Sequence, residues 1–205
     1  MQDAKYHVQM EIAGPVAMFS RPDTGSAFVS YPAPTYSAAK GVFESIARLK
    51  SAYIDPTRVE ICRPVQFHRY ATNYGGPLRK PAKLKDGTGY QLQAVIPVDV
   101  CYRLYGEVRE VSPTRTKANH LHALQEMFGR RLRKGQWFAT PCLGWQEFTP
   151  SYVGPFREVT HVEESLELEI PSMLHSVFSA PVAGQYAPRY KQNIRISKGV
   201  LVYAE

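Results

Sequence analysis

Cysteine is scarce in this 205-residue sequence. The three cysteines, Cys62, Cys101 and Cys142, are odd in number and widely spaced, which argues against a disulfide framework and against a CxxC zinc site. No apolar run is long enough to cross a bilayer, and the segment 1–15 lacks the apolar core of a signal peptide. We therefore expect a soluble protein of the reducing cytoplasm.

Several catalytic motifs are also missing. The sequence has no GxxxxGK[ST] phosphate loop, no GxGxxG fingerprint and no GxSxG nucleophile elbow, which argues against nucleotide hydrolysis and serine chemistry. The HxH pair His120 and His122 supplies at most two zinc ligands, and no other cluster has a matching spacing. We expect no metal and no other cofactor.

Acidic residues are the minority, 18 against 25 lysines and arginines, and the cations gather in two windows. Such clustering suits a polyanionic partner better than an even spread does. The first window, 68–89, is rich in glycine and proline and predicts a basic loop with interleaved Tyr70 and Tyr74, which could stack on unpaired bases. Its cations are Arg69, Arg79, Lys80, Lys83 and Lys85, against Asp86 alone.

The second window, 115–134, sets six cations against Glu126. They are Arg115, Lys117, Arg130, Arg131, Arg133 and Lys134. Cations are expected at any helix C-terminus because of the helix dipole, so an ordinary solvated helix end is one interpretation. Phosphate binding is the other, and the two windows together indicate an RNA groove.

The first half of the chain predicts alternating strands and helices. Val8, Met10 and Ile12 alternate with polar residues, which predicts a strand that ends at Gly14-Pro15. The segment 31–53 has apolar residues at helical spacing, with Thr35 or Ser37 as the N-cap.

Two further strands and a second helix follow. Alternation over 59–67 predicts a strand with an edge or bulge at Pro64, and 90–104 predicts one long strand or two joined at Pro97. The segment 116–136 predicts a helix with Leu121, Leu124 and Phe128 on its buried face. Ser112 or Thr116 is its expected cap, and Gly135 its end.

The resulting order, β, α, β, β, α, matches the α+β ferredoxin-like plan up to its last strand, a plan shared by RNA-recognition modules and many unrelated proteins. Beyond Gly135 the chain becomes rich in short strand-like segments. We expect a ferredoxin-like RNA-binding domain over 1–135 and a smaller β-rich portion over 136–205 packed on it.

RNA can be cut without metal when its own 2′-hydroxyl attacks the adjacent phosphate. This requires a base, an acid and a cation that offsets the extra charge. Lys117 and His120 are close in sequence, whereas His122 points about 200° away from His120 on a helix. His120 is therefore the better candidate, although both histidines could equally be surface or packing residues.

The spaced motifs of the chain resemble one known family. They are Gly14-Pro15 followed by AMFSRP (17–22), YPAPTYSAAKGVFESI (31–46), RPVQF (63–67), GRRLRKGQ (129–136) and CLGWQEF (142–148). As a set they are similar to the CRISPR-associated Cas-five proteins of the type I-C kind, in the repeat-associated RNA-binding superfamily.

The resemblance implies a function and partners. It implies a subunit that binds the 5′ handle of CRISPR RNA in a Cascade surveillance complex, beside the backbone and large subunits. It also implies metal-independent cutting of the precursor RNA.

The family's catalytic positions are not kept. The position of its tyrosine is occupied by Ala47, and its Lys-His pair falls on Ala123 and Leu124. His120 lies one helical turn before Leu124 and Lys117 one turn earlier, so the activity could have moved along the helix, with Tyr36 or Tyr53 replacing the missing tyrosine. The alternatives are a non-catalytic RNA-binding subunit that relies on another nuclease, and a nonspecific DNA-binding or DNA-cleaving protein.

Overall fold

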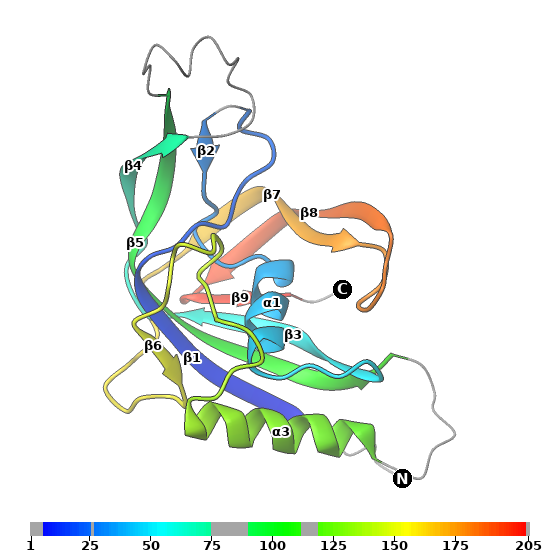
Figure 1. Ribbon diagram of the computed structural model, residues 1–205. Helices are drawn as coiled ribbons and strands as arrows, with labels where there is room; N and C mark the ends of the chain where they lie inside the picture. Colours follow the sequence, from blue (N-terminus) through cyan, green and yellow to red (C-terminus); the bar gives the residue numbers. More distant parts are fainter. Residues whose placement is uncertain (1–5, 26, 75–89, 112–118, 204–205) are drawn as a thin grey trace.

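The computed structural model describes residues 6–25, 27–74, 90–111 and 119–203. Within these ranges the chain is an α+β structure, in which two helices accompany a mostly antiparallel sheet (Figure 1). The helices are α1 (Tyr36–Ile46) and α3 (His120–Lys134). The strands are β1 (His7–Val16), β2 (Phe28–Val29), β3 (Ala52–Ile61), β4 (Gln66–Tyr74), β5 (Tyr90–Glu110), β6 (Tyr152–Gly154), β7 (Leu168–Phe178), β8 (Tyr186–Ser197) and β9 (Val200–Val202).

Strand β5 organises the sheet. It runs for 21 residues without a break at Pro97, so the longer of the two predicted alternatives is correct. The strand order is β6-β1-β5-β3-β9-β8-β7, and β2 and β4 pair with β5 outside this path. The prediction that β1 ends at Gly14-Pro15 is wrong, because the pairing with β5 resumes at Val16. Pro15 has no amide hydrogen, but one missing donor does not end a ladder that continues on both sides of it.

Strands β3 and β4 follow one another along the same side of β5, separated by Arg63-Pro64. Ile61 pairs with Tyr102 and Gln66 pairs with Val98. Four residues, 62–65, therefore lie opposite three, 99–101, and the register shifts by one. The irregularity predicted at Pro64 is confirmed, but 59–67 is not one strand, because the break at 62–65 separates β3 from β4.

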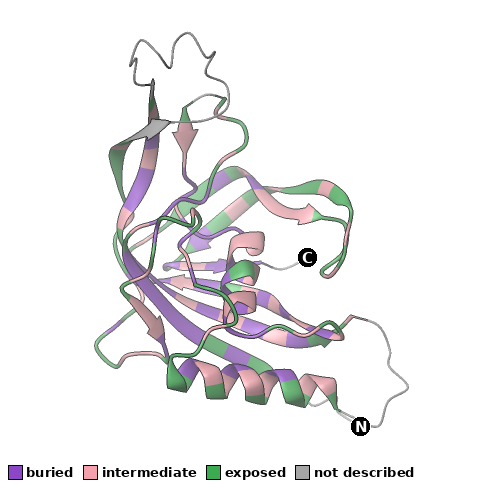
Figure 2. Ribbon diagram, viewed as in Figure 1, coloured by how far each residue is buried: buried purple, intermediate pink, exposed green. Residues whose placement is uncertain are grey.

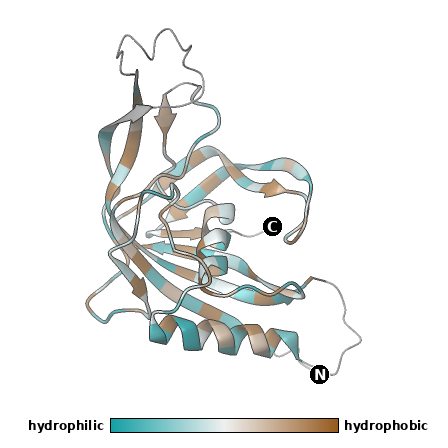
Figure 3. Cartoon of the chain, in the orientation of Figure 1, coloured by the Kyte–Doolittle hydropathy of each residue, from teal (hydrophilic) through white to brown (hydrophobic). Residues whose placement is uncertain are grey.

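The core lies between the helices and the central strands. Val42, Phe43 and Ile46 of α1, and Leu124, Phe128 and Leu132 of α3, are buried together with the alternate residues of β1, β3 and β5. The rings of Phe43 and Phe128 lie 5.7 Å apart and join the two helices. Figure 2 shows buried residues along β1 and β5, and Figure 3 shows hydrophobic residues alternating with hydrophilic ones along the same strands. Each such side chain contributes roughly 1.5–3 kcal/mol on burial.

The helix ends are set by local capping. The Thr35 hydroxyl accepts from the amide of Ala38, as predicted. For α3 the cap is Asn119, whose side chain accepts from the amide of His122, so neither Ser112 nor Thr116 is the cap. Both lie outside the described residues. Gly135 ends α3 with φ of 62°, a left-handed conformation that glycine adopts without strain.

A buried carboxylate fastens a loop to the sheet. Glu11 of β1 is fully buried and accepts from Arg157 Nε at 2.6 Å, from the Arg157 amide at 3.0 Å and from the Thr160 hydroxyl at 3.0 Å. Arg103 Nε of β5 lies 3.6 Å from the same carboxylate. Burial raises the pKa of Glu11, but the hydrogen bonds from Arg157 and Thr160 outweigh it and leave the pKa below its ordinary value.

The second half of the chain adds β6 at one end of the sheet and β9, β8 and β7 at the other. The prediction of β-rich structure after Gly135 is confirmed in these strands. The β7–β8 hairpin curves over the N-terminal end of α1 in Figure 1, and Ser37 of α1 donates to the backbone oxygen of His175 of β7. A cavity lies beside this contact, between the helix and the hairpin.

Candidate RNA-binding and catalytic site

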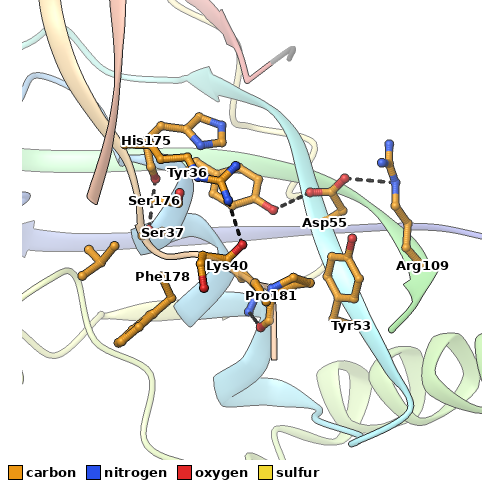
Figure 4. Close-up of a pocket in the computed structure, with 14 residues that line it drawn as sticks. Tyr36, Ser37, Lys40, Tyr53, Asp55, Arg109, His175, Ser176, Phe178 and Pro181 are labelled. Carbon is orange, nitrogen blue, oxygen red and sulfur yellow. Dashed lines mark hydrogen bonds and ion pairs between the residues drawn. The ribbon is translucent and has the colours of Figure 1, made fainter. Parts of the chain in front are cut away.

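The cavity between α1, β3 and the β7–β8 hairpin contains two of the predicted catalytic residues, Tyr36 and Tyr53 (Figure 4). Its volume is about 220 Å³, and Arg109 of β5 also lines it. Tyr36 is the first residue of α1, and Tyr53 and Asp55 are alternate residues of β3, so the side chains of Tyr53 and Asp55 lie on the same face of the strand. The hydrogen bond from Tyr36 to Asp55 joins the helix to this face. The residues that line it are Tyr36, Ser37, Lys40, Tyr53, Asp55, Arg109, His175, Ser176, Val177, Phe178, Ser179, Ala180, Pro181 and Arg189.

The Tyr36 hydroxyl is committed to Asp55. It donates a 2.6 Å hydrogen bond to Oδ1, while Arg109 Nε lies 3.0 Å from Oδ2. Burial, and then the hydrogen bond to Asp55, raise the pKa of Tyr36 far above its ordinary value. The phenol therefore stays protonated, which suits a structural or proton-donating role and not that of a base.

Tyr53 lies beside a cation. Lys40 Nζ of α1 is 5.9 Å from the centre of the Tyr53 ring, a distance at the outer limit of a cation–π interaction. Lys40 Nζ also contacts Glu44 at 2.5 Å and the backbone oxygen of Pro181 at 2.7 Å. The last contact ties α1 to the loop between β7 and β8.

His175 is one of the cavity residues that the sequence did not single out. Its ring stacks on that of Tyr36, with centres 4.3 Å apart and planes 12° apart. Burial, followed by the charge of Lys191, lowers the pKa of His175, so the imidazole is neutral at pH 7. An isolated histidine in a strand carries no sequence signal, and the same holds for Asp55, Arg109 and Arg189.

His120 occupies a different place, at the first position of α3. Its Nδ1 lies 2.8 Å from the hydroxyl of Ser51, the residue before β3. His122 is exposed, and its ring is tilted against that of Tyr6 at 6.2 Å. Helix α3 begins at His120, after its cap Asn119. Lys117 itself lies outside the described residues.

The cations at the end of α3 divide into two groups. Arg130, Arg133 and Lys134 are exposed, as a phosphate-binding surface requires. Arg131 is half-buried and donates to the backbone oxygen of Ile46 at 3.0 Å. It therefore satisfies one of the orphan carbonyls at the C-terminus of α1, in addition to any role toward RNA.

The first basic window is only partly a loop. Arg69 is exposed, but it lies in β4 opposite Val95, so the prediction of an irregular basic loop is wrong for 68–74. The Tyr70 ring packs edge-on against Phe148 at 5.5 Å, which joins β4 to the segment after α3. Residues 66–74 form a strand despite their polar composition, because pairing with β5 outweighs it. Arg79, Lys80, Lys83, Lys85 and Arg115 lie outside the described residues.

The positions that the resemblance assigns to catalysis carry no suitable groups. Ala47 ends α1 and Leu124 lies in the core, each with 1% exposure. Ala123 is exposed on α3. Neither Ala47 nor Leu124 could present even a substituted side chain to RNA without repacking the core.

Within the described residues no group of three or more histidine, cysteine or acidic side chains is placed to hold a metal ion. The same part of the chain has no helix long and apolar enough to span a membrane.

Comparison with known proteins places these features in a family. The family model described as CRISPR-associated protein (Cas_Cas5) matches residues 8–192. A curated relative from Thermus thermophilus, named CRISPR pre-crRNA endoribonuclease Cas5d, is 31% identical over 169 residues, which cover 82% of this chain and 71% of the relative.

Two solved structures share the fold. One, titled as the crystal structure of a CRISPR-associated protein, superposes with a TM-score of 0.70 at 18% identity and covers 97% of this chain and 92% of its own. The other belongs to a CRISPR RNA-guided surveillance complex, with a TM-score of 0.51 at 14% identity over 91% of this chain and 90% of its own. From the family match over 8–192 we conclude that the chain belongs to the CRISPR-associated Cas5 family.

Proposed function

We propose that the protein binds the 5′ handle of CRISPR RNA as a subunit of a type I-C-like surveillance complex in the cytoplasm and cuts the precursor RNA within its repeat. The observation that carries this proposal is the match to a relative named as a pre-crRNA endoribonuclease. The exposed Arg130, Arg133 and Lys134 supply the cationic surface that such a role needs. The backbone and large subunits of the complex are the expected protein neighbours.

The fold supports this role. The strands β1, β3, β5 and β6 with α1 and α3 give the order β, α, β, β, α, β, and they lie side by side as β6-β1-β5-β3. We interpret this unit as ferredoxin-like, the plan used by RNA-recognition modules. We propose that 1–135 forms its main body and 136–205 a smaller portion, although β6 of the second part completes the sheet of the first.

For cleavage we propose a metal-independent reaction with His120 as the base. The ribose 2′-hydroxyl gives its proton to His120 and attacks the adjacent phosphorus. The bond to the 5′-oxygen breaks, that oxygen takes up a proton, and a 2′,3′-cyclic phosphate remains. If His120 Nδ1–H donates to Ser51, its lone pair lies on Nε2, which is the arrangement that a base requires. Lys117, Tyr36 and Tyr53 remain candidates for the acid and for charge stabilisation.

A non-catalytic handle-binding subunit is the second candidate. The observation that favours it is the loss of the family's catalytic side chains at Ala47, Ala123 and Leu124. Such a subunit would hold RNA cut by another nuclease, and it needs cations but neither an acid nor a base.

The decisive experiment incubates the purified protein with its own repeat RNA in excess EDTA and analyses the product ends. We expect a single cut that leaves a cyclic phosphate, and loss of that cut with retained binding in His120→Ala. Tight binding without any cut establishes the non-catalytic subunit instead. Equal affinity for repeat RNA and duplex DNA at one salt concentration would contradict RNA specificity and support a DNA-binding protein.

A further inference from the structure

The tip of the β7–β8 hairpin exposes aromatic side chains. Phe178 is 57% exposed and Tyr186 is 76% exposed. The two are direct partners in the ladder between β7 and β8, so their rings lie on the same side of the hairpin. Soluble proteins rarely expose large aromatic side chains next to one another, and where they do, the rings often form a binding surface.

Beyond Glu169, near the start of β7, the hairpin has no acidic residue; the Glu169 carboxylate lies 3.9 Å from Arg195 of β8. From Ile170 to Ala204 the sequence contains no aspartate or glutamate, but besides Arg195 it contains Arg189, Lys191 and Lys198. Arg189 is exposed, and it donates to the neutral backbone oxygen of Ser179 at 2.7 Å, a contact that does not cancel its charge. The hairpin therefore presents aromatic faces within a locally positive potential.

The exposed tip borders the cavity described above. Phe178 and Arg189 both line it, and Figure 4 shows Phe178 and Tyr53 on opposite sides of it. On the helix side the charges are balanced, because Lys40 pairs with Glu44, and Arg109 pairs with Asp55. The net positive charge at the mouth of the cavity therefore comes from the hairpin.

The cavity is held in place by contacts that do not involve the side chains of Phe178, Tyr186 or Arg189. Ser37 donates to the backbone oxygen of His175 at 3.0 Å, Lys40 donates to that of Pro181, and Tyr36 stacks on His175. These contacts fix the hairpin against α1. The rings of Phe178 and Tyr186 are thus presented on a supported strand pair, which lowers the entropic cost of binding.

We propose that the hairpin-tip surface, made of Phe178, Tyr186 and Arg189, stacks unpaired bases of single-stranded RNA and that the adjacent cavity receives one nucleotide. Arg189 contacts the backbone phosphate. This inference rests on the proposed function, since it says where the RNA runs beyond α3. Single-stranded RNA fits better than a duplex because only unpaired bases offer their faces to aromatic rings.

The surface is separate from the cations of α3. Tyr36 at the N-terminus of α1 lies by the cavity, whereas Ile46 at the C-terminus contacts Arg131 of α3. The 11 residues of α1 span ~16 Å at a rise of about 1.5 Å per residue. The RNA strand is thus contacted at both ends of this helix.

The test compares substitutions of exposed aromatic residues of the hairpin, Phe178 in β7 and Tyr186 and Tyr190 in β8. Phe178→Ala and Tyr186→Ala are measured for binding of an unstructured fluorescent RNA by anisotropy at fixed salt. The control is Tyr190→Ala, an exposed tyrosine of the same strand that pairs with Leu174 instead of with the tip. We expect the tip variants to bind roughly five- to a hundredfold more weakly, the range for one stacked base, and the control to change less than twofold.

A second measurement locates the contact directly. RNA carrying 4-thiouridine is photocrosslinked to the wild-type protein, and the modified residues are identified by mass spectrometry. We expect adducts on the peptides that carry Phe178 or Tyr186. Free nucleoside monophosphate in large excess should not displace the RNA, because binding to the chain also uses α3. Displacement would show that the cavity takes free nucleotides and would overturn the assignment to RNA.

The outcomes separate this inference from the proposed function. If wild type binds RNA and the tip variants bind equally well, with no crosslink at the tip, the inference is overturned while the proposed function stands. If the tip variants bind RNA normally but no longer assemble with partner subunits, the surface docks protein and the inference is again overturned. If wild type binds no RNA, the proposed function itself fails.

Discussion

The guanidinium of Arg131 donates a hydrogen bond of 3.0 Å to the backbone carbonyl of Ile46 and so links α3 to the C-terminal end of α1. Its neighbours Arg130, Arg133 and Lys134 are exposed. One short cationic sequence thus serves two purposes, and substitutions within it should separate stability from RNA binding.

Arg131→Ala should lower the free energy of unfolding by about 1–2 kcal/mol, because the Ile46 carbonyl loses a charged donor. Urea denaturation measures this loss. Arg130→Ala, on the exposed side of the same helix, is the matched control and should change stability by less than about 0.5 kcal/mol. Equal stabilities of the two variants would show that the Arg131 contact contributes nothing.

Arg130→Ala combined with Lys134→Ala should weaken binding of repeat RNA and make it less dependent on salt. Each lost phosphate contact should reduce the slope of log affinity against log salt by about 0.7 on a single strand. Titrations at several salt concentrations measure the slope. An unchanged slope would place the RNA away from α3.

Ser51→Ala should slow cleavage without weakening RNA binding, because the hydrogen bond between His120 Nδ1 and the Ser51 hydroxyl orients the imidazole ring. We expect a decrease smaller than that of His120→Ala, for which loss of a general base costs about 10²- to 10⁴-fold. Single-turnover cleavage in EDTA gives both rates. The pH dependence of the rate should change in Ser51→Ala if the residue acts through His120, and a merely structural serine would leave it unaltered.

Tyr36→Phe should destabilise the protein by about 1–2 kcal/mol, since the Asp55 carboxylate loses a short hydrogen bond. The stack with His175 is retained. Cleavage should change less than tenfold, because the strongly raised pKa keeps the phenol protonated and Asp55 already accepts its proton in a hydrogen bond. A decrease of a hundredfold or more with normal RNA affinity would instead make Tyr36 a participant in proton transfer.

Acid should destabilise the protein through Glu11. The pKa of this carboxyl is lower in the folded state than its ordinary value of 4.5, so its stabilising contribution is complete above about pH 4.5 and is lost as the pH falls through the folded-state pKa. Glu11→Gln should lower the free energy of unfolding by about 2–3 kcal/mol at pH 7. The loss should be modest for a broken ion pair with a buried carboxylate, because its partner Arg157 is partly exposed. Denaturation measured at several pH values checks this prediction. The difference in free energy of unfolding between wild type and Glu11→Gln should become smaller as the pH falls from 7 to 3.

Much of the fold could be predicted because its signals are local. Alternation predicts β1 and β5, Thr35 is one of the two predicted caps of α1, and Gly135 is the predicted end of α3. Each of these signals acts within a few residues. The errors arose where a tertiary partner decided the outcome. Residues 68–74 form a strand because β5 offers a continuous ladder, and α3 begins later than predicted because Asn119 supplies the cap.

The candidate site was likewise predictable only in part. Sequence indicated Tyr36, Tyr53, His120 and the cations of α3, because these residue types suit RNA chemistry. It missed Asp55, Arg109, His175 and Arg189, which come from β3, β5, β7 and β8 and meet only around the cavity. No local spacing rule relates residues of four different strands, the first and last of which, Asp55 and Arg189, lie 134 positions apart.

The sequence by itself determined the helices, most of the strands, the cationic character and the family, since periodicity, capping and motif spacing are properties of short segments. Only the tertiary structure decided that Arg131 caps α1, that His120 meets Ser51 and that the β7–β8 hairpin brings Phe178 and Arg189 to the cavity that Tyr53 also lines. These relationships depend on how β5 pairs its neighbours and on how the hairpin closes over α1, and both are set by long-range packing that no local pattern encodes.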